Sequence, residues 1–571
     1  MTCTKFKLTT VAALVFAATN ANAALYQVVE VATPSSITGA SETFGVAIQP
    51  ATVTGTESCF TTGTVGSVAC GDFKLAGETR DTLEAVSYRE EVPFAMDAPF
   101  QYIQERDDFE NYCYRELRYS TCESWADNRW YDTWNKERND LTYVNAKAFV
   151  EGGDTFETRN TVINSLDEDA KPLGVKSEGS IRNNALFTTT AGPTGTSETR
   201  AWKAITASNG TVYNVGSVST KGPATDTSDT TFSSKAAIWD ASYTKELNWG
   251  ENVSAREDEF FSQGSMRGIT EVNNRFYGVG YNTVNGNGDL RDMNANIFVS
   301  NEIDFANAVD LSTVTWENKF ISGAEVKSGS SNDDARYSNS VATDINDNLF
   351  AVGYSKRNGY VPESGSAGNK PFVVIDAKNP TATYLSGGIF FGGSSGEAKA
   401  VNNFNEFVGQ IDAETTREVD GSERRHRGFI YPYNVSSSTE ARRVDIFNGQ
   451  AWWLDDLTND GNVSGENNKF RIIDATDIND AGVISATAIK CTVGGTTQPY
   501  DTTSHNSYCG GASSNAVEEV VAVKLVPIAG ATKDDIQTRS ADSEKVDRQG
   551  GSLGWLTLTV LGLLGFRRKF K

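Results

Sequence analysis

One acidic segment has the residue spacing of a calcium-binding loop. Asp456, Thr458 and Asp460 place oxygen ligands at positions 1, 3 and 5, and Gly461 supplies the glycine at position 6. Hard cations such as Ca²⁺ take oxygen ligands in this pattern. The twelfth position should be a bidentate glutamate, but it is Asn467. The match is therefore incomplete, and the competing interpretation is that these side chains form turns with their own backbone.

The sequence contains none of the common catalytic motifs. It has no GxSxG nucleophile elbow, no HExxH metal motif and no P-loop, and the glycine-rich stretch 392–396 lacks the lysine of a P-loop. Of the two histidines, His426 lies among arginines and His505 lies between Cys491 and Cys509. No catalytic or cofactor-binding residue is therefore assigned. A carboxylate pair for glycoside hydrolysis stays open, because such a pair is matched in space rather than along the chain.

The N-terminus has the layout of a secretory signal peptide. Lys5 and Lys7 precede an apolar run over residues 8–18, and Ala21-Asn22-Ala23 supplies the small residues of a cleavage site. We expect signal peptidase to cut after Ala23 and remove residues 1–23. The alternative, a first transmembrane helix, is disfavoured because the run is much shorter than the roughly 20 apolar residues that span a bilayer.

Six of the seven cysteines follow this cleavage site, and they predict disulfides. They form three close pairs along the chain: Cys59 with Cys70, Cys113 with Cys122, and Cys491 with Cys509. An even number of cysteines in an exported chain is typical of disulfide bonds, and proximity favours this pairing among the fifteen that six cysteines allow. No CxxC spacing occurs and histidines are few, so a zinc site is disfavoured.

The mature chain is strongly acidic. The formal net charge is -23, from 51 Lys and Arg against 74 Asp and Glu. Removing two lysines of the signal segment and four basic residues of the C-terminal tail leaves 45 against 74, or -29. A protein this acidic repels nucleic acid and anionic lipid. Nucleic-acid binding is therefore disfavoured, and we expect ligands that are neutral, cationic or bridged by divalent metal.

Between residues 24 and 545 the composition predicts an all-β fold built from repeats. The segment is rich in Thr, Ser, Asn and Gly and shows no alternation of strands with long amphipathic helices. One β-hairpin pattern occurs five times: an apolar β-branched residue, a polar turn, and a second apolar stretch that ends on a small residue. The copies span residues 204–216, 268–280, 342–353, 400–409 and 475–486.

The turns of these hairpins contain residues that tolerate a positive φ angle. Tight primed turns between strands require that angle, and Asn and Gly adopt it most readily. The positions predicted to adopt it are Asn209-Gly210, Asn273-Asn274, Asn348, Asn405 and Gly482.

A further short β run follows each hairpin, which gives a unit the size of a propeller blade. These runs are 236–239, 296–299, 371–375, 428–431 and 520–525. Single units cannot bury their apolar faces, so we predict a β-propeller of six or seven blades. An early strand at 44–48 extends the pattern, and closure is predicted to pair 25–31 with 520–525. The alternatives are an open β-solenoid or another multi-sheet β assembly.

The segment 95–139 interrupts the β pattern and is predicted to be a helical insertion. It is dense in charged and aromatic residues and free of glycine. On one continuous helix Cys113 and Cys122 would lie about 13 Å apart, too far for a disulfide, so the helix must break near Ser120-Thr121. Trp125, Trp130, Trp134 and the tyrosines of this segment either form a carbohydrate or protein contact patch or, as we favour, pack against the β body.

The C-terminus, residues 546–571, has the layout of a sorting tail. The pair Gly550-Gly551 is followed by an apolar run over 553–566 and then by the basic residues 567–569. As a helix this run reaches about 21 Å, which is short for a hydrocarbon core of roughly 30 Å. The tail resembles GlyGly-CTERM signals, which implies cutting near the glycine pair by a rhomboid-type membrane protease and export by the type II secretion machinery. A permanent C-terminal anchor is the alternative.

The hairpins resemble the HAF type of extracellular repeat. The match is best where Asp-Ile-Asn-Asp is intact, at 344–347 and 477–480, whereas the copies at 205–216 and 269–280 carry three extra turn residues. With both terminal signals, the chain resembles an uncharacterised family of Gram-negative secreted proteins, a domain of unknown function. The resemblance spans most of the chain and implies passage through the periplasm to the cell surface or medium, with the precursor held in the inner membrane only by its C-terminal segment.

Two classes of function remain. The first is a non-catalytic surface-attached or secreted protein that binds a glycan, matrix polymer or protein partner. The second is a secreted hydrolase, glycosidase-like, with a carboxylate pair hidden among the loops. Irregular loops on a repeated scaffold favour the first class, because recognition concentrates in loops held by a rigid frame. Carboxylates that converge in one central pocket would favour the second.

Overall fold

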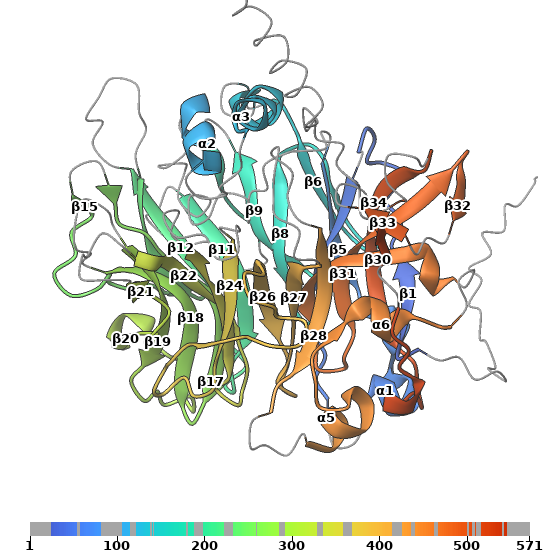
Figure 1. Ribbon diagram of the computed structural model, residues 1–571. Helices are drawn as coiled ribbons and strands as arrows, with labels where there is room; N and C mark the ends of the chain where they lie inside the picture. Colours follow the sequence, from blue (N-terminus) through green and yellow to red (C-terminus); the bar gives the residue numbers. More distant parts are fainter. Residues whose placement is uncertain are drawn as a thin grey trace, which may run out of the picture.

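The computed structural model shows a mainly β protein with a few short helices (Figure 1). It describes residues 24–40, 42–53, 58–80, 105–114, 121–136, 140, 142–178, 181–187, 198–221, 232–257, 260–284, 292–327, 335–357, 368–413, 425–434, 440–461, 466–498, 502–504, 509, 515–539 and 542–544. The signal segment 1–23 and the sorting tail from residue 546 lie outside these ranges. Among the described residues, no helix has the length and apolar character to cross a membrane.

The described strands form a β-propeller with six complete blades of four or five strands. A three-stranded sheet, which we call the short blade, stands between blades 1 and 2. Each sheet packs on the next one along the chain, and blade 6 packs on blade 1. The prediction of an all-β propeller with six or seven blades is confirmed, and the open solenoid is excluded.

The first half of the ring runs from blade 1 to blade 3. Blade 1 consists of β2 (Glu42–Ile48), β5 (Leu75–Arg80), β6 (Ala146–Val150) and β7 (Thr155–Phe156). The short blade consists of β8 (Thr161–Leu166), β9 (Pro172–Glu178) and β10 (Ile181–Phe187). Blade 2 consists of β11 (Glu198–Thr206), β12 (Val212–Lys221), β13 (Phe232–Trp239) and β14 (Thr244–Glu246). Blade 3 consists of β17 (Gly264–Val272), β18 (Arg275–Val284), β19 (Asp292–Ser300) and β20 (Trp316–Phe320).

The second half of the ring holds blades 4 to 6. Blade 4 consists of β21 (Val326–Lys327), β22 (Ala335–Ile345), β23 (Ala351–Arg357), β24 (Asn369–Val374) and β25 (Thr383–Tyr384). Blade 5 consists of β26 (Gly396–Val401), β27 (Glu406–Asp412), β28 (His426–Pro432) and β29 (Trp452–Trp453). Blade 6 consists of β30 (Phe470–Ile478), β31 (Ile484–Val493), β34 (Val517–Pro527), β1 (Tyr26–Glu30) and β32 (Thr496–Gln498), which extends β31.

Small elements decorate this ring. Three short strand pairs are β3 (Thr64–Val65) with β4 (Val68–Ala69), β15 (Arg256–Glu257) with β16 (Phe260–Phe261), and β33 (Thr502–Ser504) with β35 (Asp542–Glu544). The helices are α1 (Cys59–Thr62), α2 (Arg106–Tyr112), α3 (Glu123–Arg129), η3 (Trp130–Trp134), α5 (Glu440–Phe447) and α6 (Leu454–Thr458). Single 3₁₀ turns are η1 (Cys70–Asp72), η4 (Leu311–Thr313), η5 (Asn467–Lys469) and η7 (Lys533–Asp535).

All five predicted hairpins form two adjacent strands of one blade. The pairs are β11 with β12, β17 with β18, β22 with β23, β26 with β27, and β30 with β31. The β run predicted after each hairpin supplies the strand that pairs with the second strand of that hairpin. The repeat unit inferred from the sequence is therefore confirmed in blades 2 to 6.

The positive φ angles lie mostly where they were predicted. Asn273 and Asn274 have φ of 52° and 58°, Asn405 has 55° and Gly482 has 87°. In the β22–β23 turn, however, the residue with positive φ is Leu349, at 58°, and not Asn348. Asn346 accounts for the shift, since its side-chain oxygen accepts hydrogen bonds from the N–H of Asn348 and of Phe350 and thereby fixes the turn.

The N-terminal strand closes the ring as predicted. Strand β1 pairs antiparallel with β34, with Val28 opposite Leu525 and Tyr26 opposite Pro527. Side chains of both strands, among them Tyr26, Val28 and Val523, belong to one buried apolar cluster. Blade 6 thus combines strands from near both ends of the described chain, and the pairing of β1 with β34 closes the ring.

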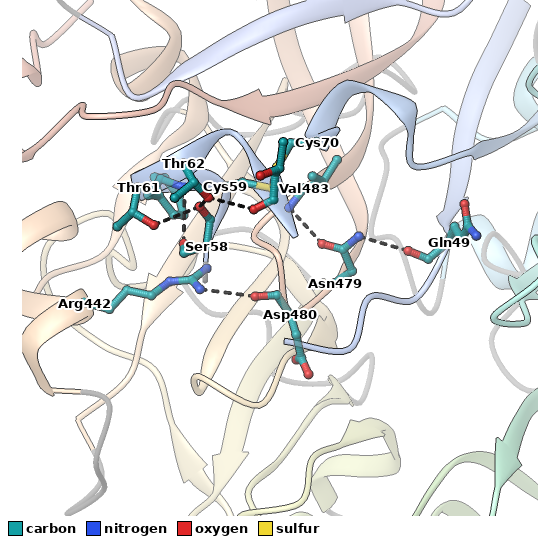
Figure 2. The surroundings of a disulfide bond; sticks show 12 residues. Gln49, Ser58, Cys59, Thr61, Thr62, Cys70, Arg442, Asn479, Asp480 and Val483 are labelled. Atoms are coloured by element: carbon teal, nitrogen blue, oxygen red, sulfur yellow. Dashed lines mark hydrogen bonds between the residues drawn. A yellow bond between two sulfur atoms is a disulfide. The ribbon is translucent and has the colours of Figure 1, made fainter. Parts of the chain in front are cut away.

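The three predicted disulfides are all present. They join Cys59 to Cys70, Cys113 to Cys122 and Cys491 to Cys509, with Cα separations of 5.8, 5.6 and 5.7 Å. The first ties α1 to η1 beside blade 6 (Figure 2). Three disulfides indicate that the protein resides in an oxidising compartment.

The stapled helical hairpin is confirmed as well. Helix α2 and helix α3 lie beside each other above the short blade in Figure 1, and the Cys113–Cys122 disulfide joins them. Phe109 is fully buried and contacts the rings of Trp125 and Trp130 at 6.1 and 6.3 Å. Phe109, Trp125 and Trp130 therefore pack on one another within the hairpin, and packing of these rings against the β body stays a prediction. Trp134 belongs to η3, and its side chain is not among those described.

Candidate functional site

The centre of the propeller holds a polar pocket of about 120 Å³. The innermost strand of every sheet contributes to its wall. Representative lining residues are Val46, Ser165, Lys203, Arg267, Asp344, Lys399 and Asp477. Trp202 also lines the pocket, and the Arg267 guanidinium stacks on its ring at 3.5 Å.

Several carboxylates line this pocket, and each of them contacts a lysine or accepts a hydrogen bond from an N–H group. Asp344 Oδ1 accepts a hydrogen bond from Lys203 Nζ at 2.6 Å, and its Oδ2 accepts one from the N–H of Val401 at 3.1 Å. Burial alone would lower the pKa of Lys203, but the neighbouring Asp344 and Asp477 outweigh it and raise that pKa. The lysine therefore stays charged, and it neutralises the acids that face it.

A second group of charges lies on the next inner strands. Lys399 Nζ lies 2.7 Å from Asp474 Oδ2 and 3.8 Å from Glu397 Oε2. Glu397 also accepts a hydrogen bond from the side chain of Asn369 at 2.6 Å. These two acids are thus committed to contacts inside the protein.

Asp477 is the least neutralised carboxyl group of the pocket. It accepts hydrogen bonds from the N–H of Ile48 at 3.0 Å and from its own neighbour Ile478 at 2.9 Å. Burial raises the pKa of Asp477 to about 6, with Asp344 adding to the rise while Lys203 opposes it. This carboxyl group therefore changes its charge in a mildly acidic environment.

The raised pKa predicts how stability depends on pH. An unfolded aspartate titrates near 3.9, so between about pH 4 and 6 the folded protein binds more protons, and the contribution of Asp477 to stability falls as pH rises. Asp477→Asn keeps the acceptor for Ile48 and mimics the protonated form. We expect it to raise the free energy of unfolding at pH 8 by about 1–3 kcal/mol and to change it little at pH 4.

Denaturant unfolding at both pH values, with the disulfides intact, tests this prediction. Asp344→Asn is the matched control, because it takes away the partner of Lys203 and should weaken the fold at pH 8. A wild type more stable than Asp477→Asn at pH 8 would contradict it.

The Asp-Ile-Asn-Asp repeat joins neighbouring blades. The side-chain N–H of Asn346 donates to the carbonyl of Asn402, that of Asn402 donates to the carbonyl of Asn479, and that of Asn479 donates to the carbonyl of Gln49, at 2.8, 3.2 and 2.9 Å. Figure 2 shows the last of these links beside the Cys59–Cys70 disulfide. One amide per blade therefore connects blades 4, 5, 6 and 1 in series.

The first aspartate of the repeat makes a second link between blades. Asp344 in blade 4 accepts from Val401 in blade 5, and Asp477 in blade 6 accepts from Ile48 in blade 1. The polar residues of the motif thus satisfy backbone and side-chain groups of the next blade. Their recurrence is explained by assembly of the ring, without a bound cation.

The residues of the proposed calcium loop lie apart from this pocket. Asp456 is buried in the first turn of α6, and its Oδ1 accepts a hydrogen bond from the N–H of Arg539 at 2.8 Å. The hydroxyl of Thr458 donates to the carbonyl of Leu454 within the same helix. Asp460 precedes Gly461, whose φ is 71°. Within the described residues no group of three His, Cys, Asp or Glu side chains is arranged to hold a metal; calcium binding at 456–466 stays a prediction.

One of the two histidines, His426, lies among the described residues. His426 begins β28, and its Nε2 lies 3.3 Å from Asp412 Oδ1. Its arginine-rich surroundings in the sequence suggest an exposed side chain, whereas this side chain is only about a quarter exposed and contacts this acid. His505 lies outside the described residues.

Sequence reasoning missed the lysines of the central pocket. Lys203 and Lys399 belong to β11 and β26, and each faces an acid that belongs to another blade, 141 and 75 residues further along the chain. A usable signal was present, because each lysine lies at the start of a recognised hairpin copy. Aligning the hairpins would have placed both on the inner strands.

Together, the fold and the pocket define a disulfide-linked β-propeller whose centre is filled by paired charges. The family model described as a protein of unknown function, DUF3466, matches residues 208–569, which is more than half of the chain. The chain belongs to this family. Among proteins of curated function, none matches it.

Proposed function

We propose that this protein is an exported, non-catalytic binding protein that is released to the medium or held at the cell surface. Three disulfides support an oxidising destination. The family match continues to residue 569, so it includes Gly550-Gly551, the apolar run and the basic residues that follow. Sharing this tail with a family supports a sorting role for it, served by the rhomboid-type protease and type II machinery that the GlyGly-CTERM resemblance implies.

The observation that carries the non-catalytic assignment is the pairing of charges in the central pocket. Asp344 and Asp474 are bound by lysines, Glu397 by Asn369, and Asp477 by two backbone N–H groups. A glycosidase needs one carboxylate free to attack or activate water and one acid free to protonate the leaving group. A pocket of about 120 Å³ is also small for a polymer.

Processing of the tail provides a direct test. We expect Gly550→Leu with Gly551→Leu to stiffen the cut site, so that the variant stays in the membrane fraction while the wild type reaches the medium. Immunoblots of membrane and medium fractions measure this distribution, and Ser552→Ala is the matched control beside the glycine pair. Equal release of the leucine variant and the wild type would remove the tail from the proposal.

A secreted hydrolase is the second candidate, and one observation favours it. Acids from blades 4, 5 and 6 do meet in one central pocket, and the pKa of Asp477 is about 6, a range useful for a general acid. Assays of reducing ends released from a panel of polysaccharides decide between the candidates. Hydrolysis that Asp477→Asn abolishes would establish the enzyme and overturn the binding assignment.

A further inference from the structure

A second pocket, of about 490 Å³, lies at the side of blade 5. Its walls come from the segment 386–390, which connects β25 to β26, and from the segment 449–453, which leads from α5 into β29. Ligand pockets in proteins commonly measure about 300–1,000 Å³. This pocket is therefore large enough for a small organic ligand, unlike the central one.

Aromatic rings form the apolar part of the wall. Phe390 is buried and stacks on Tyr431, with ring centroids 6.0 Å apart. Trp452 and Trp453 stand half-buried on the adjoining strand. The indole N–H of Trp452 donates to the carbonyl of Phe447 at 2.6 Å, which fixes this ring. The wall thus offers large, rigid, amphipathic surfaces that lose little conformational freedom on binding.

Polar groups without protein partners accompany these rings. Among the described residues, nothing forms a hydrogen bond with the side chain of Ser386, Tyr431 or Gln450. Asp456 also lines the pocket, and only its Oδ1 is engaged, by the N–H of Arg539. Hydroxyl, amide and carboxylate groups are therefore ready to donate to and accept from a ligand.

The rim of the pocket is held in place before any ligand arrives. Gly387 and Phe390 exchange two backbone hydrogen bonds, of 2.9 and 3.0 Å, around a tight turn. Gly387 and Gly388 have φ of 81° and 58°, and the space that a Cβ atom would occupy is empty at both. A preformed wall reduces the entropy lost on binding.

Charge selects the class of ligand. The Arg427 guanidinium already lies over the Trp453 ring at 4.7 Å, so the ring is not free to form a cage for a quaternary ammonium group. The carboxylate of Asp456 lies within the influence of this guanidinium, so the two charges offset each other, and the net charge of the mature chain, -29 as counted above, disfavours anions. A neutral ligand with both apolar faces and many hydroxyl groups fits this wall best.

We propose that the pocket formed by Phe390, Tyr431, Trp452, Trp453, Gln450 and Asp456 binds a neutral saccharide. The proposal rests on the non-catalytic binding function and names its ligand class. Sugar rings present C–H faces that pack on indole and phenol rings, and their hydroxyl groups pair with the amide of Gln450 and the carboxylate of Asp456.

Calorimetric titration of the mature protein purified from the medium tests this site. The probes are glucose, maltose, cellobiose and N,N′-diacetylchitobiose, with choline and glucuronate as charged probes. We expect at least one neutral sugar to bind, Trp453→Ala to weaken it about 10- to 100-fold, and Gln450→Ala to weaken it about 3- to 10-fold. Because Gln450 is exposed and its side chain forms no hydrogen bond within the described protein, its variant stays folded even if Trp453→Ala does not.

Tyr243→Ala is the matched control, since Tyr243 is an aromatic residue 41% exposed between β13 and β14 of blade 2, and it should bind like the wild type. A sugar that binds equally to the Gln450 and Trp453 variants overturns this site and leaves the binding function standing. Preference for choline or glucuronate, or no sugar bound by the folded wild type, overturns the ligand class. Hydrolysis of the bound sugar overturns the non-catalytic function itself.

Discussion

Replacing Arg442 with alanine should lower the free energy of unfolding by about 3–5 kcal/mol, because it leaves a buried carboxylate without its partner. Arg442 extends from α5 to Glu406 in β27, with Nε 2.7 Å from Oε1 and a second guanidinium nitrogen 2.8 Å from Oε2. The side chain of Glu406 is 1% exposed. Burial raises its pKa while Arg442 lowers it, and the net shift is upward.

The same guanidinium joins several elements at once. It donates to the carbonyl of Asp480 at 3.2 Å, as Figure 2 shows, and lies over the rings of Phe60 and Phe404 at 4.9 and 4.1 Å. Replacing Arg442 with alanine therefore removes the side chain that joins α5 to α1 and to the turns of blades 5 and 6. This loss of packing adds to the cost of the unpaired acid.

Denaturant unfolding of three variants measures the effect. Glu406→Gln combined with Arg442→Ala should recover part of the lost stability, because the double variant leaves no unpaired charge at this buried position. Lys171→Ala is the control, since the Lys171–Asp169 pair is exposed at 50% and 74% and its removal should hardly change stability. A loss for Arg442→Ala as small as that for Lys171→Ala would refute the role of the buried pair.

Much of the propeller could be predicted because its signals are local. In blades 2 to 6 each hairpin joins two β runs across a few Asn, Asp or Gly residues. The two strands and their turn can therefore be recognised in a segment of about a dozen residues. The disulfides follow the same rule, since each joins cysteines 9 to 18 residues apart. Ring closure could also be predicted, because the sequence shows one β run near each end, at 25–31 and at 520–525, and pairing these two runs completes a blade.

In the first part of the ring only the strand at 44–48, which is β2, was predicted, and the rest escaped prediction for physical reasons. In the short blade the β8–β9 turn places Ala170 at φ 59°, where Gly or Asn is the usual signal, and Asp167 compensates by accepting from the N–H groups of Asp169 and Lys171. In blade 1, β5 and β6 are neighbours in space but are separated along the chain by the helical insertion. Neither hairpin carries the local pattern that marked the other five.

The pockets could not be predicted because they join residues that are distant in sequence. Central charge pairs such as Lys203–Asp344 depend on which inner strands face each other across the ring, a property of closure and not of any single repeat. The aromatic pocket combines a loop after blade 4 with a segment inside blade 5, and Trp452 and Trp453 stand outside the repeat pattern. Only the calcium motif was visible locally, and the structure uses Asp456 and Thr458 of that motif for hydrogen bonds inside the protein.

Val28→Asp should destabilise the protein by about 3 kcal/mol or more, because it buries a charge in the strand that closes the ring. Val28 is 8% exposed, and its N–H donates to the side chain of Asn467 at 2.9 Å. Its neighbours in the cluster include residues of β31 and β34. An aspartate there has no cation to pair with among the apolar side chains of that cluster, so the strand must leave β34 or the carboxyl group must bind a proton.

Gln27→Asp is the matched control, since Gln27 is the exposed neighbour on the same strand and the substitution introduces the same charge. Urea unfolding gives the loss of stability, and limited proteolysis shows whether β1 is released. We expect Val28→Asp alone to expose the segment 24–31 to protease, because freeing β1 leaves β34 as an unpaired edge. If both variants lose equal stability, β1 does not close the ring through its buried face, and blade 6 must be held by β30, β31 and β34 alone.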